Sequence, residues 1–161
     1  MSELTLRKPN IKDAGTIAEM IQYYASRGFL LQRTLGQVCE SLRDFVVCEQ
    51  DGVIVGCGAL HLWSDLAEIR SLAVPEKMWR KGIGTAIVSA CLNEARSLGV
   101  KETFVLTYQP DFFKRLGFRE VSKDRFPQKI WIDCANCPHF PNCTEVALIT
   151  DVEEEKSASA S

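Results

Sequence analysis

The amino-acid sequence predicts a mixed α/β fold in a single domain. With 161 residues, of which 46% are hydrophobic and 25% charged, the chain has the size and composition of one globular domain with a core. Two β-like runs, 45–49 and 53–62, flank an Asp-Gly pair, which is a strong hairpin signal. A third run, 68–74, precedes a stretch of helical periodicity that stops near Gly99. Strands and amphipathic helices are therefore expected to alternate.

Local signals place the remaining elements. A short strand at 4–7 ends at a proline, and Asn10 or Asp13 can cap a helix whose apolar stripe continues to Gly28. Thr34 and the glutamine three residues later form a capping box that opens a second short helix. The elements expected further along are a strand at 103–108, a helix at 110–116, and strands at 129–133 and 145–150.

Composition excludes several classes of protein. The net charge of −2 gives no bulk field for nucleic acid or an anionic membrane surface. No apolar run approaches the roughly 20 residues that span a bilayer, and residues 1–8 lack the apolar core of a signal peptide. Four of the seven cysteines fall in apolar or periodic segments, which favours reduced, buried thiols in the cytoplasm over a disulfide framework. These four are Cys39, Cys48, Cys57 and Cys91.

Two glycines with basic neighbours mark a strand-to-helix corner at Gly82 and Gly84. Glycine lets the backbone approach a ligand closely, and the first turn of a helix presents unpaired N–H groups. Such a corner can hold a pyrophosphate, and Lys77, Arg80 and Lys81 add positive charge. Taken alone, however, a Gly-x-Gly corner is more often a tight turn without a ligand.

Three segments in order resemble the GCN5-related N-acetyltransferase (GNAT) family. They are Leu72-Ala73-Val74-Pro75, Arg80-Lys81-Gly82-Ile83-Gly84 and Phe113-Lys114-Arg115-Leu116-Gly117-Phe118. The resemblance covers roughly residues 4–123 and implies a mostly antiparallel central sheet flanked by helices, with acetyl-CoA as cosubstrate. One departure is Trp79, which stands where the family's loop usually has arginine or glutamine.

The resemblance also implies roles for particular residues. Glu68 is expected to be the general base, often acting through water; the alternative is a solvated carboxylate at a strand edge. A backbone N–H at the end of the 68–74 strand would polarise the thioester carbonyl. The expected cofactor-binding residues are Leu72, Ala73, Val74, Arg80, Lys81, Gly82, Ile83, Gly84 and Thr85.

The general acid is a second departure from the family. Phe113 occupies the position of the usual tyrosine and cannot donate a proton. Tyr108 and Thr107 are possible substitutes, and a coenzyme A thiolate can also leave unaided because a thiol is a fairly good acid. The acid stays unassigned.

The acceptor is expected to be an amino acid. Arg33, with the 68–74 and 112–118 segments, resembles the acetyltransferase domain of N-acetylglutamate synthases, which hold the glutamate carboxylates with an arginine at this position. Lys129 and Arg70 are the further expected contacts. A planar arginine fork matches a carboxylate well, although Arg33 can equally be an exposed helix-capping residue. The expected function is thus N-acetylglutamate synthesis, the first step of arginine synthesis.

The segment 134–143 carries three cysteines whose role stays open. Cys134, Cys137 and Cys143, with His139, could complete a tetrahedral zinc site. Reduced structural thiols and a redox-active pair are the alternatives. The acidic and then small, polar residues 153–161 are expected to be disordered, which leaves 1–152 as the acetyltransferase domain.

Two other functions remain compatible with the sequence. One is acetylation of another small amine or a peptide N-terminus. The other is a non-catalytic module that binds coenzyme A or a metal, which the missing tyrosine keeps open. A small-molecule acceptor is the expected partner, without nucleic acid or membrane, and a homodimer is compatible with the sequence.

Overall fold

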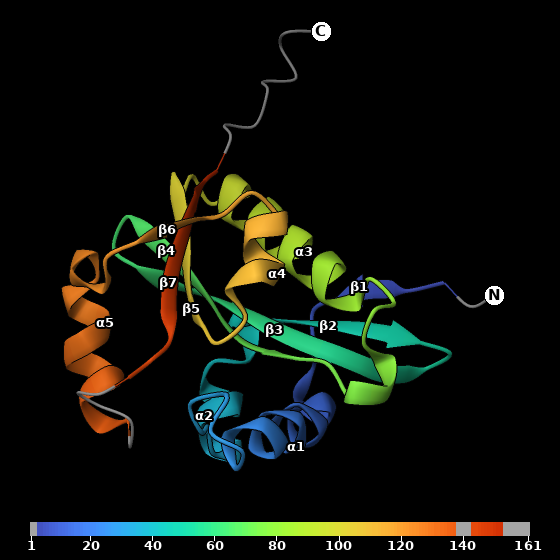
Figure 1. Cartoon of the computed structure of the whole chain (residues 1–161). Helices are drawn as coiled ribbons and strands as arrows, with labels where there is room; N and C mark the ends of the chain where they lie inside the picture. The colour runs from blue at the N-terminus through green and yellow to red at the C-terminus, as the bar shows by residue number, and fades with distance from the viewer. Residues whose placement is uncertain (1–2, 138–142, 153–161) are drawn as a thin grey trace, which may run out of the picture. The chain divides into compact units, whose positions relative to one another are not determined.

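The computed structural model describes residues 3–137 and 143–152 and divides into two units (Figure 1). The first unit contains Met1–His61 and Ile69–Cys91, and the second contains Leu62–Glu68 and Leu92–Ser161. Seven strands hydrogen-bond in the order β1-β2-β3-β4-β5-β7-β6. Within the described residues no helix is both long and apolar enough to cross a membrane.

The helices and strands largely follow the sequence prediction. The strands are β1 (Thr5–Arg7), β2 (Phe45–Gln50), β3 (Val53–Trp63), β4 (Leu66–Ala73), β5 (Glu102–Thr107), β6 (Arg119–Val121) and β7 (Val146–Asp151). The α-helices are α1 (Ala14–Ala25), α2 (Leu35–Glu40), α3 (Ile83–Ser97), α4 (Pro110–Arg115) and α5 (Pro127–Ile132). Short 3-10 helices are η1 (Ile11–Asp13), η2 (Leu42–Asp44), η3 (Glu76–Met78), η4 (Lys123–Arg125) and η5 (Cys134–Asn136).

In the first unit, β1 pairs antiparallel with β2, and β2 pairs antiparallel with β3. The predicted hairpin is confirmed: Asp51 and Gly52 both have left-handed backbone conformations, with φ of 54° and 78°. Helices α1 and α2 lie side by side, and their apolar residues join the core of this unit (Figure 1). Its fully buried members include Ile17, Ile21 and Val47.

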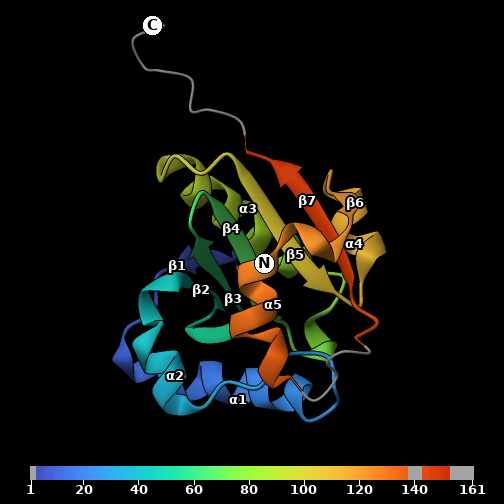
Figure 2. The same ribbon diagram turned by 90° about the vertical axis from the view of Figure 1, so that its left-hand side faces the viewer.

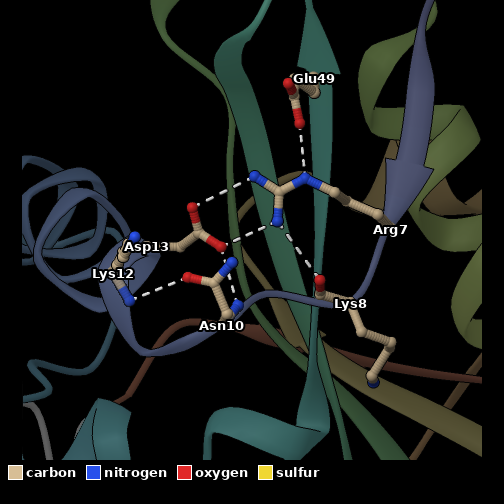
Figure 3. Close-up of polar contacts among 6 residues, drawn as sticks. All are labelled: Arg7, Lys8, Asn10, Lys12, Asp13 and Glu49. Atoms are coloured by element: carbon tan, nitrogen blue, oxygen red, sulfur yellow. Dashed lines mark hydrogen bonds and ion pairs between the residues drawn. The ribbon is translucent and has the colours of Figure 1, made fainter.

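A polar cluster around Arg7 fixes the start of α1 (Figure 3). The Arg7 guanidinium donates to both carboxylate oxygens of Asp13 and to Glu49 on β2. Asp13 accepts from the Asn10 backbone N–H, while the Asn10 side chain accepts from the Lys12 N–H at 2.9 Å. The hydrogen bonds from Arg7 hold the pKa of Asp13 below its usual value of 3.8. Asn10 therefore caps η1, the 3-10 helix that leads into α1, whereas Asp13, the N-cap residue of α1, makes no side-chain capping hydrogen bond.

Two glycines in β3 allow α3 to pack closely on this strand. A Cβ atom at Gly58 would lie 2.7 Å from Cγ2 of Ile87, and one at Gly56 would lie 2.8 Å from Cγ2 of Ile83. These distances are too short for any real side chain, so α3 packs directly on the backbone of β3. A glycine within a strand commonly marks such a close approach.

The second unit is built around β5 and β7. The parallel pairing of β4 with β5 covers only Leu66–Glu68. Strand β7 lies between β5 and β6 and is antiparallel to both (Figure 2). Phe104 and Phe126 stack with ring centroids 4.0 Å apart in the core of this unit. Apart from β4–β5, the pairings with a given register are antiparallel, as the resemblance implied.

The prediction of a strand at 129–133 is wrong, because these residues belong to helix α5 and its C-cap. Pro127 occupies the first turn of α5, where a proline is tolerated because that N–H has no helical partner. The Asp133 N–H donates to the Lys129 carbonyl at 3.0 Å, and the two side chains form an i,i+4 ion pair. Strand β6 was not predicted either. His139 and the predicted disordered tail at 153–161 lie outside the described residues.

Candidate functional site

The glycine corner in the first unit has the backbone shape of an anion-binding loop. Arg80 and Gly82 both adopt positive φ, 65° and 82°, immediately before α3 begins at Ile83. Apart from Gly82 and its two chain neighbours, no atom of the described residues lies within 4 Å of the position that a Cβ atom would take at Gly82, so the backbone is open there. Left-handed residues before a helix turn consecutive N–H groups toward one side, where they can hold a phosphate.

Trp79, the departure from the family pattern in this loop, has a structural contact. Its indole N–H donates to the carbonyl of Val74 at 2.7 Å, and the same oxygen accepts from the Tyr24 hydroxyl at 2.6 Å. Burial raises the pKa of Tyr24, so its hydroxyl stays protonated and can donate. Two donors, one from α1 and one from the loop, therefore fix the backbone where β4 ends.

Strand β4 carries both the predicted base and the predicted carbonyl-polarising backbone. Glu68 lies in its first half and Ala73 at its end. Between them, Ser71 adopts φ of 57°, which is unusual for a residue other than glycine within a strand. Its carbonyl accepts from the buried Cys57 thiol at 3.6 Å. A left-handed residue interrupts the regular strand, and such irregularities are frequent next to active sites.

In the second unit, Glu68 is part of a buried charged network. Its Oε2 lies 3.0 Å from Nζ of Lys129, and its Oε1 accepts from the Trp63 indole N–H at 3.0 Å. Lys129 also contacts Oδ2 of Asp133 at 2.9 Å. The exposed fractions are only 2% for Glu68, 6% for Lys129 and 9% for Asp133. Two carboxylates thus share one ammonium away from bulk solvent.

Electrostatics keep that ammonium charged. Burial alone lowers the pKa of Lys129, but the charges and hydrogen bonds of Glu68 and Asp133 outweigh it, so the pKa lies above the usual 10.5. Sequence reasoning named Glu68 and Lys129 separately and missed their pairing, as well as Asp133 and Trp63. The i,i+4 spacing of Lys129 and Asp133 is a signal that could have found part of the network, had α5 been recognised as a helix.

Other titratable groups of the second unit interact with this network. Burial raises the pKa of Glu145, with a further contribution from the charge of Glu68. Glu145 accepts from the Cys143 thiol at 3.4 Å. Burial, followed by the charge of Glu145, raises the pKa of Tyr108. Tyr108 therefore keeps its proton at neutral pH, which a general acid requires.

Phe113, which replaces the usual tyrosine, is a core residue. It is buried, and its ring packs edge-on against Phe112 and Phe118 with centroids 5.0 and 5.3 Å away. Its role in the second unit is therefore packing.

Arg33 lies in a depression of about 560 Å³ within the first unit. Two arginines and one glutamate are its charged lining residues, so the lining is net positive. The residues that line it are Ala18, Glu19, Gln22, Tyr23, Ser26, Arg27, Gln32, Arg33, Thr34 and Leu35. Arg70 is half-buried on β4 and is not among them.

The cysteines are free thiols. Cys48, Cys57 and Cys91 are buried as expected, Cys39 is half-buried, and burial raises the pKa of Cys57 to about 12. Across residues 3–137 and 143–152, no group of three or more histidine, cysteine or acidic side chains could hold a metal ion. The described residues therefore do not support the zinc site considered for Cys134, Cys137 and Cys143, and we derive no chemistry from it.

Residues 15–118 match the family model described as the acetyltransferase (GNAT) family. An uncharacterized N-acetyltransferase of Chlorobaculum tepidum is 41% identical over 149 residues, which cover 92% of this chain and 96% of that protein. An amino-acid acetyltransferase of Mycobacterium tuberculosis is 42% identical over 120 residues, or 72% of this chain and 68% of that protein.

A solved structure supports the same fold. Rv2747 of Mycobacterium tuberculosis, determined in complex with CoA, superposes with a TM-score of 0.80 at 33% identity. The match covers 92% of this chain and 99% of that one. The chain therefore belongs to the GNAT family and has its fold, and it is an acetyl-CoA-dependent N-acetyltransferase.

Proposed function

We propose that this protein acetylates the α-amine of an amino acid, with L-glutamate as the first candidate, as in the first step of arginine synthesis. The observation that carries the proposal is the net positive depression around Arg33. A second arginine, Arg27, and two glutamines line it as well, which suits an acceptor with carboxylate groups. The 42% identical relative is an amino-acid acetyltransferase, in line with this acceptor class. The free thiols favour action in the cytoplasm.

The proposed chemistry assigns a role to each part of the chain. The N–H groups of the loop at Gly82 bind the pyrophosphate of acetyl-CoA. A backbone N–H near Ala73 polarises the thioester carbonyl, and Glu68 removes a proton from the acceptor ammonium, directly or through water. The amine then attacks the carbonyl carbon, a C–N bond forms and the C–S bond breaks. The thiolate takes up the second proton that the nitrogen loses; Tyr108 is the candidate to relay it.

A panel of free amino acids tests the acceptor. Purified protein is assayed with acetyl-CoA and each amino acid in turn, and thiol release is followed. We expect glutamate to have the highest kcat/KM, with glutamine poorer because it has one carboxylate instead of two. Turnover only with other small amines or peptides would refute the amino-acid assignment. Coenzyme A binding without any turnover would refute catalysis altogether.

Arg33 provides the sharper test of this proposal. Arg33→Lys keeps the charge but loses the two parallel N–H donors, so the glutamate KM should rise about 10- to 100-fold. The acetyl-CoA KM should stay unchanged. Arg43→Lys is the matched control, because Arg43 is exposed in the same unit and does not line the depression. Unchanged glutamate kinetics in Arg33→Ala would show that the carboxylate site lies elsewhere.

A further inference from the structure

We infer that Lys129 is a positioning residue that acts as the buried counter-ion of the Glu68 carboxylate and orients it, together with Asp133 and Trp63. This differs from the sequence-based expectation, in which Lys129 contacts the acceptor carboxylate. The inference rests on the proposed role of Glu68 as the general base.

The contacts of Lys129 already satisfy most of its hydrogen-bonding capacity. An ammonium has three donors, and two carboxylate oxygens lie 3.0 and 2.9 Å from Nζ. The side chain is almost completely buried between them. A substrate carboxylate at the same ammonium would be a third anion around one cation, without bulk water to screen the repulsion. The geometry is that of a structural counter-ion.

The charges around Glu68 show why a counter-ion is needed. Asp133 and Glu145 are the acidic neighbours, and the Cys134 thiol also interacts with the Glu68 charge. Lys129 is the cation in contact with Glu68. Without it, two or three acidic groups would lie together in a buried region with no cation to offset their mutual repulsion.

The network also leaves Glu68 able to react. An ionised carboxylate has about four lone-pair positions, and the contacts to Trp63 and Lys129 use one on each oxygen. The remaining positions can accept a proton from water or from an ammonium. The two contacts hold the carboxylate from both oxygens, which restricts its rotation and fixes the direction of the free lone pairs.

The test compares Lys129→Met with Lys129→Arg in the full chain, with glutamate and acetyl-CoA as the substrates. In Lys129→Met we expect kcat to fall about 10- to 100-fold. The acid limb of the kcat/KM profile should move to higher pH, because the cation in contact with the carboxylate has been removed. The acceptor KM should change less than about 3-fold. Lys129→Arg should restore part of kcat and most of the position of the acid limb.

A different result would overturn the inference. If Lys129→Met raises the acceptor KM 10-fold or more and leaves kcat and the acid limb unchanged, Lys129 binds the substrate. Asp133→Asn is the matched control for burial of the network, because it removes an anion and retains the lysine. It should move the acid limb to lower pH or leave it unchanged. A shift to higher pH in Asp133→Asn would also contradict the proposed charge balance.

The double variant separates this inference from the proposed function. Glu68→Gln alone should lower kcat about 10²- to 10⁴-fold; unchanged activity would refute the base. If Lys129 acts through Glu68, adding Lys129→Met to Glu68→Gln should cause little further loss, because the carboxylate it serves is gone. A full additional loss would refute the inference while leaving the base intact. If Lys129→Met does not fold, Trp63→Phe tests whether this network orients Glu68, since it removes the donor to the other carboxylate oxygen, Oε1.

Discussion

The phosphate-loop assignment predicts that adding one methyl group at Gly82 impairs coenzyme A binding selectively. Gly82→Ala places a Cβ atom on the open side of the backbone, where no described residue beyond its two chain neighbours has an atom within 4 Å. A clash within the protein is therefore not expected. The methyl group would instead occupy space that the pyrophosphate needs to reach the N–H groups before α3.

The structural cost of this change can be worked out from the backbone. Gly82 has φ of 82°, a conformation that costs an alanine about 1–2 kcal/mol. For a chain of this size, each kcal/mol lowers the Tm by about 2–4 °C, so a loss of roughly 2–8 °C is expected. Gly52, in the β2–β3 hairpin of the same unit, has φ of 78° and is equally open. Gly52→Ala should therefore cost the same stability.

Isothermal titration calorimetry measures the Kd for coenzyme A, and thermal unfolding measures the Tm of each variant. We expect both variants to lose similar Tm, while the coenzyme A Kd rises about 10-fold or more in Gly82→Ala and stays unchanged in Gly52→Ala. Such a rise corresponds to about 1.4 kcal/mol of lost binding free energy. Equal Kd values for the two variants would refute the reasoning, because strain alone would then explain every effect at Gly82.

Three further predictions follow from other contacts. Trp79→Phe removes one of the two donors to the Val74 carbonyl. In steady-state kinetics the acetyl-CoA KM should therefore rise about 3- to 10-fold, with kcat nearly constant. An unchanged KM would contradict a role of Trp79 in fixing the loop. Asp13→Asn should lower the Tm at neutral pH. Because the pKa of Asp13 is depressed in the folded state, the Tm difference between wild type and variant should persist above about pH 5 and shrink as the pH falls below 3.8. A Tm difference that stays constant down to acid pH would refute the ion pair. Gly58→Ala should lower the free energy of unfolding by about 1–3 kcal/mol in a denaturant titration, because the new Cβ would lie 2.7 Å from Ile87. An unchanged free energy of unfolding would show that α3 can shift to make room.

Elements whose signals are local could be predicted from the residues alone. The hairpin follows from the left-handed preference of Asp51-Gly52, and the start of η1, the 3-10 helix before α1, from the capping side chain of Asn10. Gly82 indicated a loop whose backbone a ligand can approach closely. Each of these depends on backbone conformations within a few residues, which residue identity alone restricts.

Features that depend on a partner distant in the chain could not be predicted without the folded structure. Helix α5 is six residues long, and such a short apolar segment fits a strand or a helix equally well until packing selects one. Glu68 and Lys129 come from separate elements, so their pairing requires the fold that buries both. The left-handed backbone of Ser71 has no local signal, because serine does not favour it without surrounding contacts. Long-range burial and charge pairing therefore set the chemistry of Glu68, and no local pattern encodes them.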